Sequence, residues 1–350
     1  MKVGIMSMQR IINYGSYLQA YALSNTIRNL GHEVEFVDYK IEPCICEPYT
    51  PTQVETLSEN DAHYFYEVQK FNKQFENEFL KELGISERNE RPNLDTLVIG
   101  SDEVFNCLQN NPDVGYSLEL FGKNHNAKRL ITYAACCGAT TIEKLKYYNK
   151  QDEISSLLNN FNSISVRDEN SRKLVKSLSN IEPINHLDPV LIYDFSDVIK
   201  DNVELKDYII LYGYSFNFSE EESSYIKEFA KKHNKTIISL GTWQSCADIY
   251  IPAHPLEVLS YFKKADFVIT NTFHGTIFSI KAQTPFVTAI KSYNSEKLVD
   301  LLNRLNLTGR RISSYNELDN MFSKKIDFSE TNTILAKEKE RSIEYLKQNI

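Results

Sequence analysis

Residues 266–290 read DFVITNTFHGTIFSIKAQTPFVTAI, and this stretch decides the fold. Its apolar run Phe267–Thr270 has the length of a strand, and a polar turn follows it. The segment Gly275–Ala282 has the spacing of a helix, and a second apolar run, Phe286–Ile290, closes the unit. Short apolar strands on either side of a helix are typical of a parallel sheet with helical crossovers. The stretch therefore predicts an α/β fold.

The same alternation extends along the rest of the chain. The strand Val3–Met6 precedes a helix over 16–30, and another single helix is expected over 143–158. A polar segment, Tyr193–Asp207, has the composition of an interdomain connection, and the strand–helix pattern restarts after it. We therefore expect two Rossmann-like domains that face a cleft.

The expected domain boundaries follow from this restart. They are an N-terminal Rossmann-like domain over 1–195, a C-terminal Rossmann-like domain over 196–325, and a helix over 326–350 that packs back on the N-terminal domain. Ligands of open parallel sheets bind beyond the carboxyl ends of the strands. Functional side chains are therefore sought in the turns that follow strands.

Composition narrows the class of protein. The 350 residues are 42% hydrophobic and 25% charged, which suits a soluble globular chain with a full core. The net charge of −8 and the absence of a basic stripe argue against a nucleic-acid binder. The six cysteines form no C-x-x-C pair, so we expect free thiols, no metal and no cofactor. Without an apolar leader or membrane span, the expected location is the cytoplasm.

The most informative turn is the one that contains His274. It follows the strand Phe267–Thr270 and opens the next helix, so His274 is expected at a helix N-terminus beside the cleft. Such a terminus suits an anion, Gly275 would let the backbone approach that anion, and histidine exchanges protons near neutral pH. The alternative is that His274 only satisfies polar groups of the loop.

Two further turns carry charged groups. Ser101, Asp102 and Glu103 follow an apolar strand, where the two carboxylates can act as a base or orient hydroxyls, or can simply cap a helix. Arg167 follows the strand Ser163–Val166, and its guanidinium can grip a carboxylate or phosphate. Its alternative role is a salt bridge to Asp168 or Glu169 in the same turn.

The segment Asn13-Tyr14-Gly15-Ser16 opens the first helix after the first strand. It lacks the G-x-G-x-x-G spacing, so dinucleotide binding is not favoured. Asn13 and Ser16 fit helix caps, and Gln19 is the side chain expected to reach the cleft. Several cations follow the strand Phe286–Ile290, and Lys291 is the best placed of them to meet an anion. The others are Lys297, Arg310 and Arg311.

Together these motifs resemble the polysaccharide pyruvyl transferase family. The matching pieces are NYGSYLQAYAL, LVIGSDEVFN, ITYAACCG, ISVRDENS, LDPVL and ADFVITNTFHGTIFSIKAQTPFV, in this order over residues 1 to about 310. The resemblance implies a GT-B-like architecture. It also implies transfer of the pyruvyl group of phosphoenolpyruvate to two hydroxyls of a sugar in a surface polysaccharide precursor, such as a capsule or exopolysaccharide precursor, as a cyclic ketal.

The resemblance also implies roles for the residues. His274 is the expected acid, and Asp102 or Glu103 is expected to orient or deprotonate the acceptor. The expected partners are phosphoenolpyruvate on the C-terminal side and a lipid-linked sugar on the N-terminal side, with peripheral contact at the inner membrane face. Expected donor-binding residues are Arg167, Thr272, Phe273, Gly275, Thr276 and Lys291. Expected acceptor-binding residues are Asn13, Tyr14, Gly15, Gln19 and Ser101.

One departure from the family pattern limits this transfer of roles. Some members have arginine and leucine directly before the histidine, where this chain has Thr272 and Phe273. One expected cation is therefore missing, and Lys291, Lys297 or an arginine near Arg310 would have to replace it. Two other functions remain open: a sugar-nucleotide glycosyltransferase of the same architecture, and a non-catalytic binding protein of a polysaccharide assembly complex.

Overall fold

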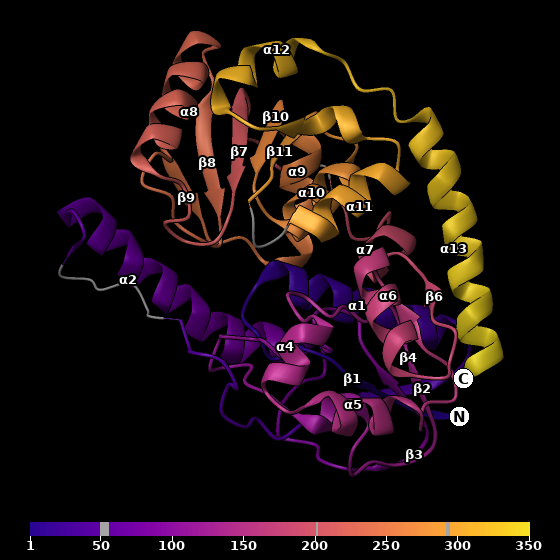
Figure 1. Ribbon diagram of the computed structural model, residues 1–350. Coiled ribbons are helices and arrows are strands. Elements are labelled where there is room, and N and C mark those ends of the chain that lie inside the picture. Colours follow the sequence, from indigo (N-terminus) through magenta and orange to yellow (C-terminus); the bar gives the residue numbers. More distant parts are fainter. Residues whose placement is uncertain (50–55, 201, 292–294) are drawn as a thin grey trace. The chain divides into compact units, whose positions relative to one another are not determined.

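The computed structural model describes residues 1–49, 56–200, 202–291 and 295–350 (Figure 1). It divides the chain into two compact units, each with its own sheet. The first unit consists of Met1–Pro51, Leu80–Tyr193 and Leu335–Ile350, and the second consists of Thr52–Phe79 and Asp194–Ile334. Among the described residues, no helix is long and apolar enough to cross a membrane.

The first unit is built on a parallel sheet with the strand order β2-β1-β3-β4. Isolated parallel bridges, Ile131 with Ser163 and Ala135 with Val166, extend the sheet from β4 toward β5. The order 2-1-3-4-5 is that of a doubly wound Rossmann-like sheet. Its strands are β1 (Lys2–Met6), β2 (Glu33–Phe36), β3 (Asn93–Ile99), β4 (Asn126–Thr132), β5 (Ser165–Val166) and β6 (Ile184–Asn185).

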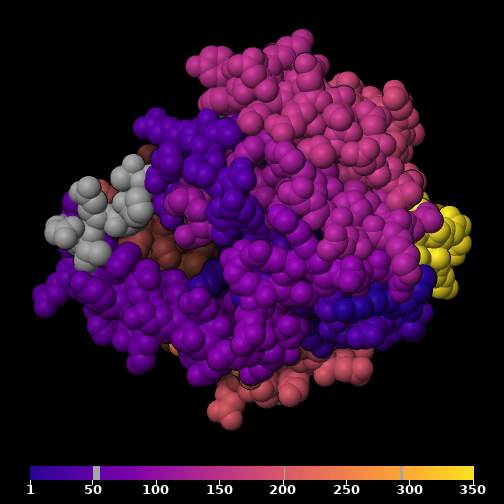
Figure 2. All heavy atoms as spheres, turned by 90° about the horizontal axis from the view of Figure 1, so that it is seen from below, coloured from indigo at the N-terminus to yellow at the C-terminus, as the bar shows by residue number. Residues whose placement is uncertain are grey.

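Helices cover the sheet of the first unit and enclose an apolar core that includes Leu97, Ile99 and Phe105. They are α1 (Tyr14–Asn29), α3 (Leu80–Glu82), α4 (Ile142–Tyr147), α5 (Gln151–Leu158), α6 (Glu169–Leu178) and α7 (Pro189–Ile192). The single helix expected over 143–158 is two helices, because Asn149 between them has a left-handed φ of 55° that ends the first one. Figure 2 shows one face of this unit, with the yellow end of the C-terminal helix at its edge.

The second unit has a six-stranded parallel sheet. Its strands are β7 (Tyr208–Tyr212), β8 (Thr236–Leu240), β9 (Ile249–Ile251), β10 (Phe267–Thr270), β11 (Phe286–Ala289) and β12 (Arg311–Ile312). Two helices, α8 (Glu220–Lys232) and α12 (Leu318–Ser323), pack on one face over an apolar core that includes Phe229 and Ile269. The helices that connect the later strands of this sheet are α9 (Val258–Lys264), α10 (Phe273–Ala282) and α11 (Ser295–Arg304).

Helix α2 (Glu59–Gln74) belongs to the second unit, although the sequence places it within the expected N-terminal domain. The reason is aromatic packing. Tyr64 stacks on Trp243 with ring centroids 3.7 Å apart, and Phe79, at the end of the π-helical turn Phe75–Phe79, contacts His254. Residues 59–79 therefore pack on residues of the second unit that lie more than a hundred positions later in the sequence.

The C-terminal helix α13 (Ser329–Asn349) contributes residues to both units. In the second unit, Thr331 Oγ1 donates to the carbonyl of Leu305 at 3.0 Å. In the first unit, the hydroxyl of Tyr345 donates to the carbonyl of Thr132 at 2.9 Å, and its ring lies against His186. The last turns of α13 thus pack on the N-terminal unit.

Candidate functional site

The strand order of the second unit locates its ligand-binding edge. The sheet runs β12-β11-β10-β7-β8-β9, so the chain moves outward from β7 in one direction and from β10 in the other. Ligands of such sheets bind beyond the carboxyl ends of the two strands where the order reverses. The loop after β7 and the turn after β10 meet there, and Asn217 Nδ2 donates to Asn271 Oδ1 at 3.3 Å. Neither asparagine was singled out from the sequence.

His274 lies on that turn, in the first turn of α10. The helix begins at Phe273, two residues earlier than expected, because Thr272 caps it: Thr272 Oγ1 accepts from the backbone N–H of Gly275 at 3.0 Å. The half-buried imidazole lies against the rings of Phe273 and Phe278, at centroid distances of 5.6 and 6.0 Å. Because a helix N-terminus carries partial positive charge, an anion is favoured beside this imidazole.

Gly275 and Thr276 stabilise the turn by their contacts with neighbouring residues. A Cβ on Gly275 would lie 2.2 Å from Thr270 Oγ1 and 2.8 Å from Tyr212 Cδ1, so glycine is needed for α10 to pack closely on β10 and β7. Thr276 is fully buried, and its hydroxyl donates to the carbonyl of Thr272 at 3.0 Å. Gly275 thus has a packing role, and the approach of an anion to its backbone stays a prediction.

Lys291 points its ammonium at a carboxylate of its own unit. Its Nζ donates to Glu222 Oε1, while Glu222 Oε2 accepts from the backbone N–H of Ser219 at 2.9 Å as part of a capping box. Lys291 therefore ties the end of β11 to the start of α8. The expected contact of Lys291 with an anionic donor stays a prediction.

In the first unit the strand order reverses between β1 and β3. Ser7 follows β1 and Ser101 follows β3, and Ser7 Oγ donates to the carbonyl of Ser101 at 2.7 Å. Gln19, on α1, donates from Nε2 to Ser7 Oγ at 3.0 Å and is fully buried. Ser101 and Gln19 thus shape the ligand-binding edge of this sheet from within rather than reaching outward.

Asp102 is the carboxylate at this edge. Its backbone has a left-handed φ of 81°, a conformation that non-glycine residues adopt at an energetic cost and that clusters at functional sites. Its carboxylate accepts from Ser16 Oγ at 3.3 Å and lies 3.6 Å from Arg167 Nη1. With a side chain that is 14% exposed, Asp102 combines a fixed orientation with access to a ligand.

Arg167 lies beneath Asp102. Its side chain is only 2% exposed, and Nη1 donates to Asp188 Oδ2 at 3.1 Å. Burial by itself lowers the pKa of Arg167, but the nearby Cys136, Asp102, Asp188 and Glu103 outweigh burial and raise it. The guanidinium is therefore a permanent buried charge. It pairs with Asp102 and Asp188, not with the Asp168 or Glu169 that the sequence suggested.

Asp188 and Asn106 complete this cluster and were missed in the sequence. Asp188 accepts from the backbone N–H of Val190 at 3.0 Å, and its Asp-Pro dipeptide at a helix start was the signal that could have identified it. Asn106 Nδ2 donates to Glu103 Oε2 at 2.8 Å. Glu103, next to Asp102 in the chain, is thus oriented by a hydrogen bond from an uncharged side chain.

The residues at the start of α1 are caps and core. Asn13 is the N-cap, and its side chain accepts from the backbone N–H of Ser16 at 2.7 Å. Tyr14 and Gly15 are buried within the unit. These three residues fix the turn after β1. This turn positions Ser16, whose hydroxyl donates to Asp102.

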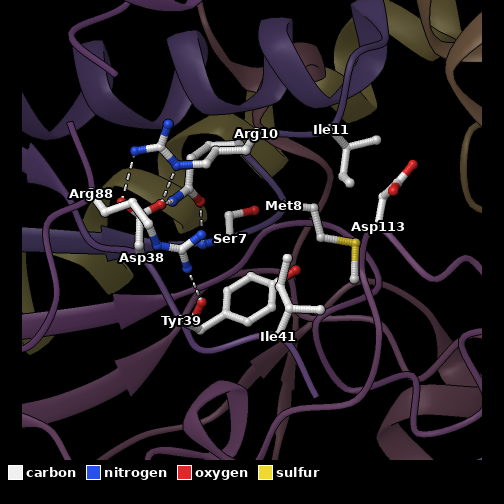
Figure 3. A pocket seen from close by; sticks show the side chains of 10 residues that line it. Ser7, Met8, Arg10, Ile11, Asp38, Tyr39, Ile41, Arg88 and Asp113 are labelled. Carbon is white, nitrogen blue, oxygen red and sulfur yellow. Dashed lines mark hydrogen bonds and ion pairs between the residues drawn. The ribbon is translucent and has the colours of Figure 1, made fainter. Parts of the chain in front are cut away.

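A cavity of about 30 Å³ lies beside this turn, at the ends of β1 and β2 (Figure 3). Arg10 spans its wall and donates from Nη2 to Asp38 Oδ2 at 2.8 Å and to the carbonyl of Glu87 at 3.1 Å. Arg88 donates from Nη2 to the carbonyl of Tyr39 at 2.7 Å. Both guanidinium groups therefore fasten the 85–90 loop to the sheet, and we assign the cavity a structural role.

Two Rossmann-like units, each with a parallel sheet, make this a GT-B-like α/β protein. Solved structures similar to the whole chain have this fold. They include the glycotransferase of kitacinnamycin (9% identity, TM-score 0.51, covering 100% of this chain and 99% of that one) and a UDP-GlcNAc 2-epimerase from Methanocaldococcus jannaschii (12%, 0.52, 99% and 100%). A trehalose-6-phosphate synthase is also similar (10%, 0.51, 100% and 100%). These identities are too low to indicate more than the fold.

The family model for polysaccharide pyruvyl transferase matches residues 13–291. The chain therefore belongs to the polysaccharide pyruvyl transferase family, and its class is that of a transferase acting in polysaccharide biosynthesis. The matched range includes both ligand-binding edges, from Asn13 through Asp102 to His274. No functionally curated protein sequence matches the chain.

Proposed function

We propose that this protein transfers the pyruvyl group of phosphoenolpyruvate to two hydroxyls of a sugar in a surface polysaccharide precursor. The products are a cyclic ketal and inorganic phosphate. One observation carries the proposal: His274, in a chain of this family, lies at the N-terminus of α10 where the strand order of the second sheet reverses. That position favours an anion next to a group that exchanges protons near neutral pH.

The reaction needs one proton donor and one base. A proton added to the methylene carbon of phosphoenolpyruvate turns it into a methyl group and leaves a cationic carbon next to the phosphate oxygen. One sugar hydroxyl attacks this carbon and loses its proton to the base. Phosphate then leaves as the second hydroxyl closes the ring, and that second proton is released with it. Positioned acids and bases accelerate such steps by about 10²- to 10⁴-fold each.

The residues of the chain divide between these tasks. His274 is the proposed acid, and the start of α10, with Thr272, Phe273, Gly275 and Thr276 forming its turn, holds the anionic donor. Asp102 is the proposed base, because Ser16 and Arg167 fix its orientation. In this assignment Arg167 acts through Asp102, and Lys291 supports the donor side through Glu222.

The acceptor belongs to the first unit in this proposal. Glu103 orients the second hydroxyl, while Ser101, Gln19, Asn13, Tyr14 and Gly15 shape the edge around it. A lipid-linked precursor would bring the protein to the cytoplasmic face of the membrane by peripheral contact. Mass spectrometry of candidate acceptors incubated with phosphoenolpyruvate identifies the acceptor, since each ketal adds a pyruvyl group to the sugar.

Ligand binding tests the proposal against the glycosyltransferase alternative. A ligand present at about 100 times its Kd stabilises the folded state by about 2.7 kcal/mol, which raises the melting temperature by several degrees. We expect phosphoenolpyruvate to give this rise and UDP-N-acetylglucosamine to give none. The opposite result would identify a sugar-nucleotide glycosyltransferase instead.

His274→Ala tests the catalytic role. We expect turnover to fall by about 10²- to 10⁴-fold while the melting temperature stays unchanged, because a half-buried side chain at a helix start contributes little to the core. Unchanged ketal formation would remove His274 from the mechanism. Thr270→Ser, a conservative change at the end of β10 that keeps the hydroxyl, is the control and should retain turnover.

A further inference from the structure

The turn that follows β3 carries a chain of hydrogen bonds that ends on Glu103. Asn106, three residues later in this turn, donates from Nδ2 to Glu103 Oε2 at 2.8 Å. Its amide oxygen accepts from the backbone N–H of Leu108 at 3.0 Å and from the hydroxyl of Thr140 at 3.3 Å. An amide whose oxygen receives two donors directs its NH₂ group at an acceptor. The orientation of Asn106 toward Glu103 is therefore set by its neighbours.

Thr140 fixes the direction of this chain. It is 1% exposed, and its Oγ1 accepts from the backbone N–H of Cys107 at 2.9 Å, so that its own hydroxyl hydrogen is donated to Asn106. The backbone N–H of Thr140 donates to the carbonyl of Cys137 at 3.0 Å. From the buried amide of Cys107 to the carboxylate of Glu103, each hydrogen of the chain points the same way. Hydrogen bonds in such a chain polarise one another, which strengthens the bond that Glu103 receives.

The loop after β4 packs closely against this bond. A Cβ on Gly138 would lie 2.5 Å from Asn106 Nδ2 and 2.7 Å from Glu103 Oε2, and Gly138 has a left-handed φ of 52°. The position therefore requires glycine. Cys136, in the same loop, donates its backbone N–H to the carbonyl of Asp102 at 2.9 Å. The stretch ITYAACCG, for which the sequence indicated no role, thus supports the turn of Asp102 and Glu103 from the side of β4.

The two adjacent carboxylates of this turn have separate supports. Asp102 is oriented by Ser16 and Arg167. Glu103 is oriented by the chain through Asn106. Ketal formation uses two hydroxyls of one sugar, and each reacts faster when an acceptor holds it in place. A carboxylate has about four acceptor positions, so a carboxylate that an amide orients can also accept from a hydroxyl. Separate supports therefore suit two hydroxyls that react in turn.

We infer that Asn106 is a positioning residue for the second hydroxyl of the acceptor sugar and that it acts by holding Glu103. The inference rests on the proposed function and deepens it. As the ring closes, the oxygen of the second hydroxyl forms its bond to the ketal carbon. The bond from that carbon to the phosphate oxygen breaks, and phosphate leaves with the electron pair. The hydroxyl proton passes to the carboxylate of Glu103 and from there to water.

Asn106→Asp tests the inference because it changes only the bond to Glu103. The variant keeps the shape of the side chain and an oxygen for Leu108 and Thr140, but it places a second carboxylate where the amide donated. Facing carboxylates share a proton and hold it to higher pH. We expect kcat for ketal formation to fall by about 10- to 100-fold at neutral pH.

The pH profile separates positioning from a purely structural role. We expect its acid limb to move to higher pH by at least about one unit in Asn106→Asp, because Glu103 must lose its proton before it can accept one. The KM for phosphoenolpyruvate should change by less than about twofold, since the donor is held by the second unit in the proposed function. The charged and titratable groups nearby are the same in both proteins, so the shift reports the introduced carboxylate; they are Arg167, Asp102, Asp188 and Cys136.

The acceptors in this assay are the octyl glycosides of glucose, galactose and mannose, whose alkyl chain stands in for a lipid link. Mass spectrometry measures the ketal. Asn111→Asp is the matched control, because it introduces the same group in the same loop. Asn111 Oδ1 accepts from the backbone N–H of Asp113 at 3.0 Å, a bond that aspartate keeps. The control should change kcat by less than about twofold.

A second pair of variants tests the chain without adding a charge. Thr140→Val removes the hydroxyl that holds Asn106 and should lower kcat by about three- to tenfold. Thr140→Ser keeps the hydroxyl and should retain most of the activity. Melting temperatures show which variants are folded, and if Asn106→Asp does not fold, this pair decides.

The outcomes separate the inference from the proposed function. If the wild type forms no ketal with any of the three glycosides, the proposed function fails and the inference falls with it. If the wild type is active and Asn106→Asp keeps its kcat and its pH profile, the inference alone is wrong. Losses of the same size in Asn111→Asp, or in Thr140→Ser as in Thr140→Val, would also overturn the inference alone.

Discussion

Arg167 shows how one buried charge can organise a ligand-binding edge. Its guanidinium bridges Asp188, which is fully buried, and Asp102, which is partly exposed. Removing one partner of such a group leaves the other charges uncompensated in a poorly solvated place. The same pairing that holds Asp102 in position therefore makes the whole first unit depend on Arg167.

Arg167→Met should consequently lower the free energy of unfolding by about 3–5 kcal/mol, because Asp102 and Asp188 remain as unpaired charges. Urea denaturation followed by circular dichroism measures it. The matched control is Arg172→Met: Arg172 pairs with Glu169 and Glu182 at the surface, so it should cost no more than about 1 kcal/mol. Equal losses in the two variants would mean that Arg167 has no special role.

At the residue scale, the sequence predicted the features that depend on residues close together in the chain. The cap at Asn13 and the placing of His274 after a strand both follow from local order. The contacts of Arg167 with Asp188, and of Lys291 with Glu222, join residues 21 and 69 positions apart. No periodicity connects such pairs, so the sequence predicted donor binding for both Arg167 and Lys291, with a nearby salt bridge as the alternative for Arg167.

At the element scale, helix α2 depends on contacts that are distant in sequence. Its Asp61 accepts a hydrogen bond from the indole Nε1 of Trp243 at 2.7 Å, and Trp243 is 1% exposed. The place of α2 between β2 and β3 in the sequence did not predict that it belongs to the second unit. The π-helical turn Phe75–Phe79 was likewise not predicted, because it reflects the packing of Phe75 and Phe79 rather than a local pattern.

Asp61→Ala should leave the indole N–H of Trp243 without its partner, at a cost of about 1–3 kcal/mol. Because Trp243 is the single tryptophan of the chain, its fluorescence reports this change directly. Amide hydrogen exchange over 59–74 should accelerate at the same time as α2 loosens. The neighbouring exposed Glu59→Ala is the control, with an effect of at most about 1 kcal/mol. Unaltered fluorescence and exchange in Asp61→Ala would show that α2 is held by other contacts.

At the scale of the whole molecule, the two Rossmann-like units were predictable and their exact membership was not. Alternating apolar and amphipathic segments predicted both parallel sheets, and the neighbouring solved structures confirm the fold class. Each unit encloses its own apolar core, one including Phe105 and the other Phe229. Units with separate cores generally unfold as separate cooperative steps.

Three buried reporters allow that expectation to be tested in the unaltered protein. Burial raises the pKa of the Cys107 thiol, in the first unit, to about 12, and burial also raises the pKa of Cys246 in the second unit. Since the thiolate is the reactive form, neither cysteine should react with iodoacetamide at pH 8 until its own unit opens and the pKa returns to about 8.5. Trp243 reports the second unit by fluorescence.

We therefore expect two transitions when the protein is titrated with urea and labelled in short pulses. Modification of Cys246, located by peptide mass spectrometry, should follow the fluorescence of Trp243, because both belong to the second unit. Modification of Cys107 should have a different midpoint. Cys246 serves as the control for the chemistry, since it shares the reagent and the burial of Cys107 but not its core. A single midpoint for all three reporters would mean that the units unfold as one, as a helix that contributes residues to both, α13, would allow.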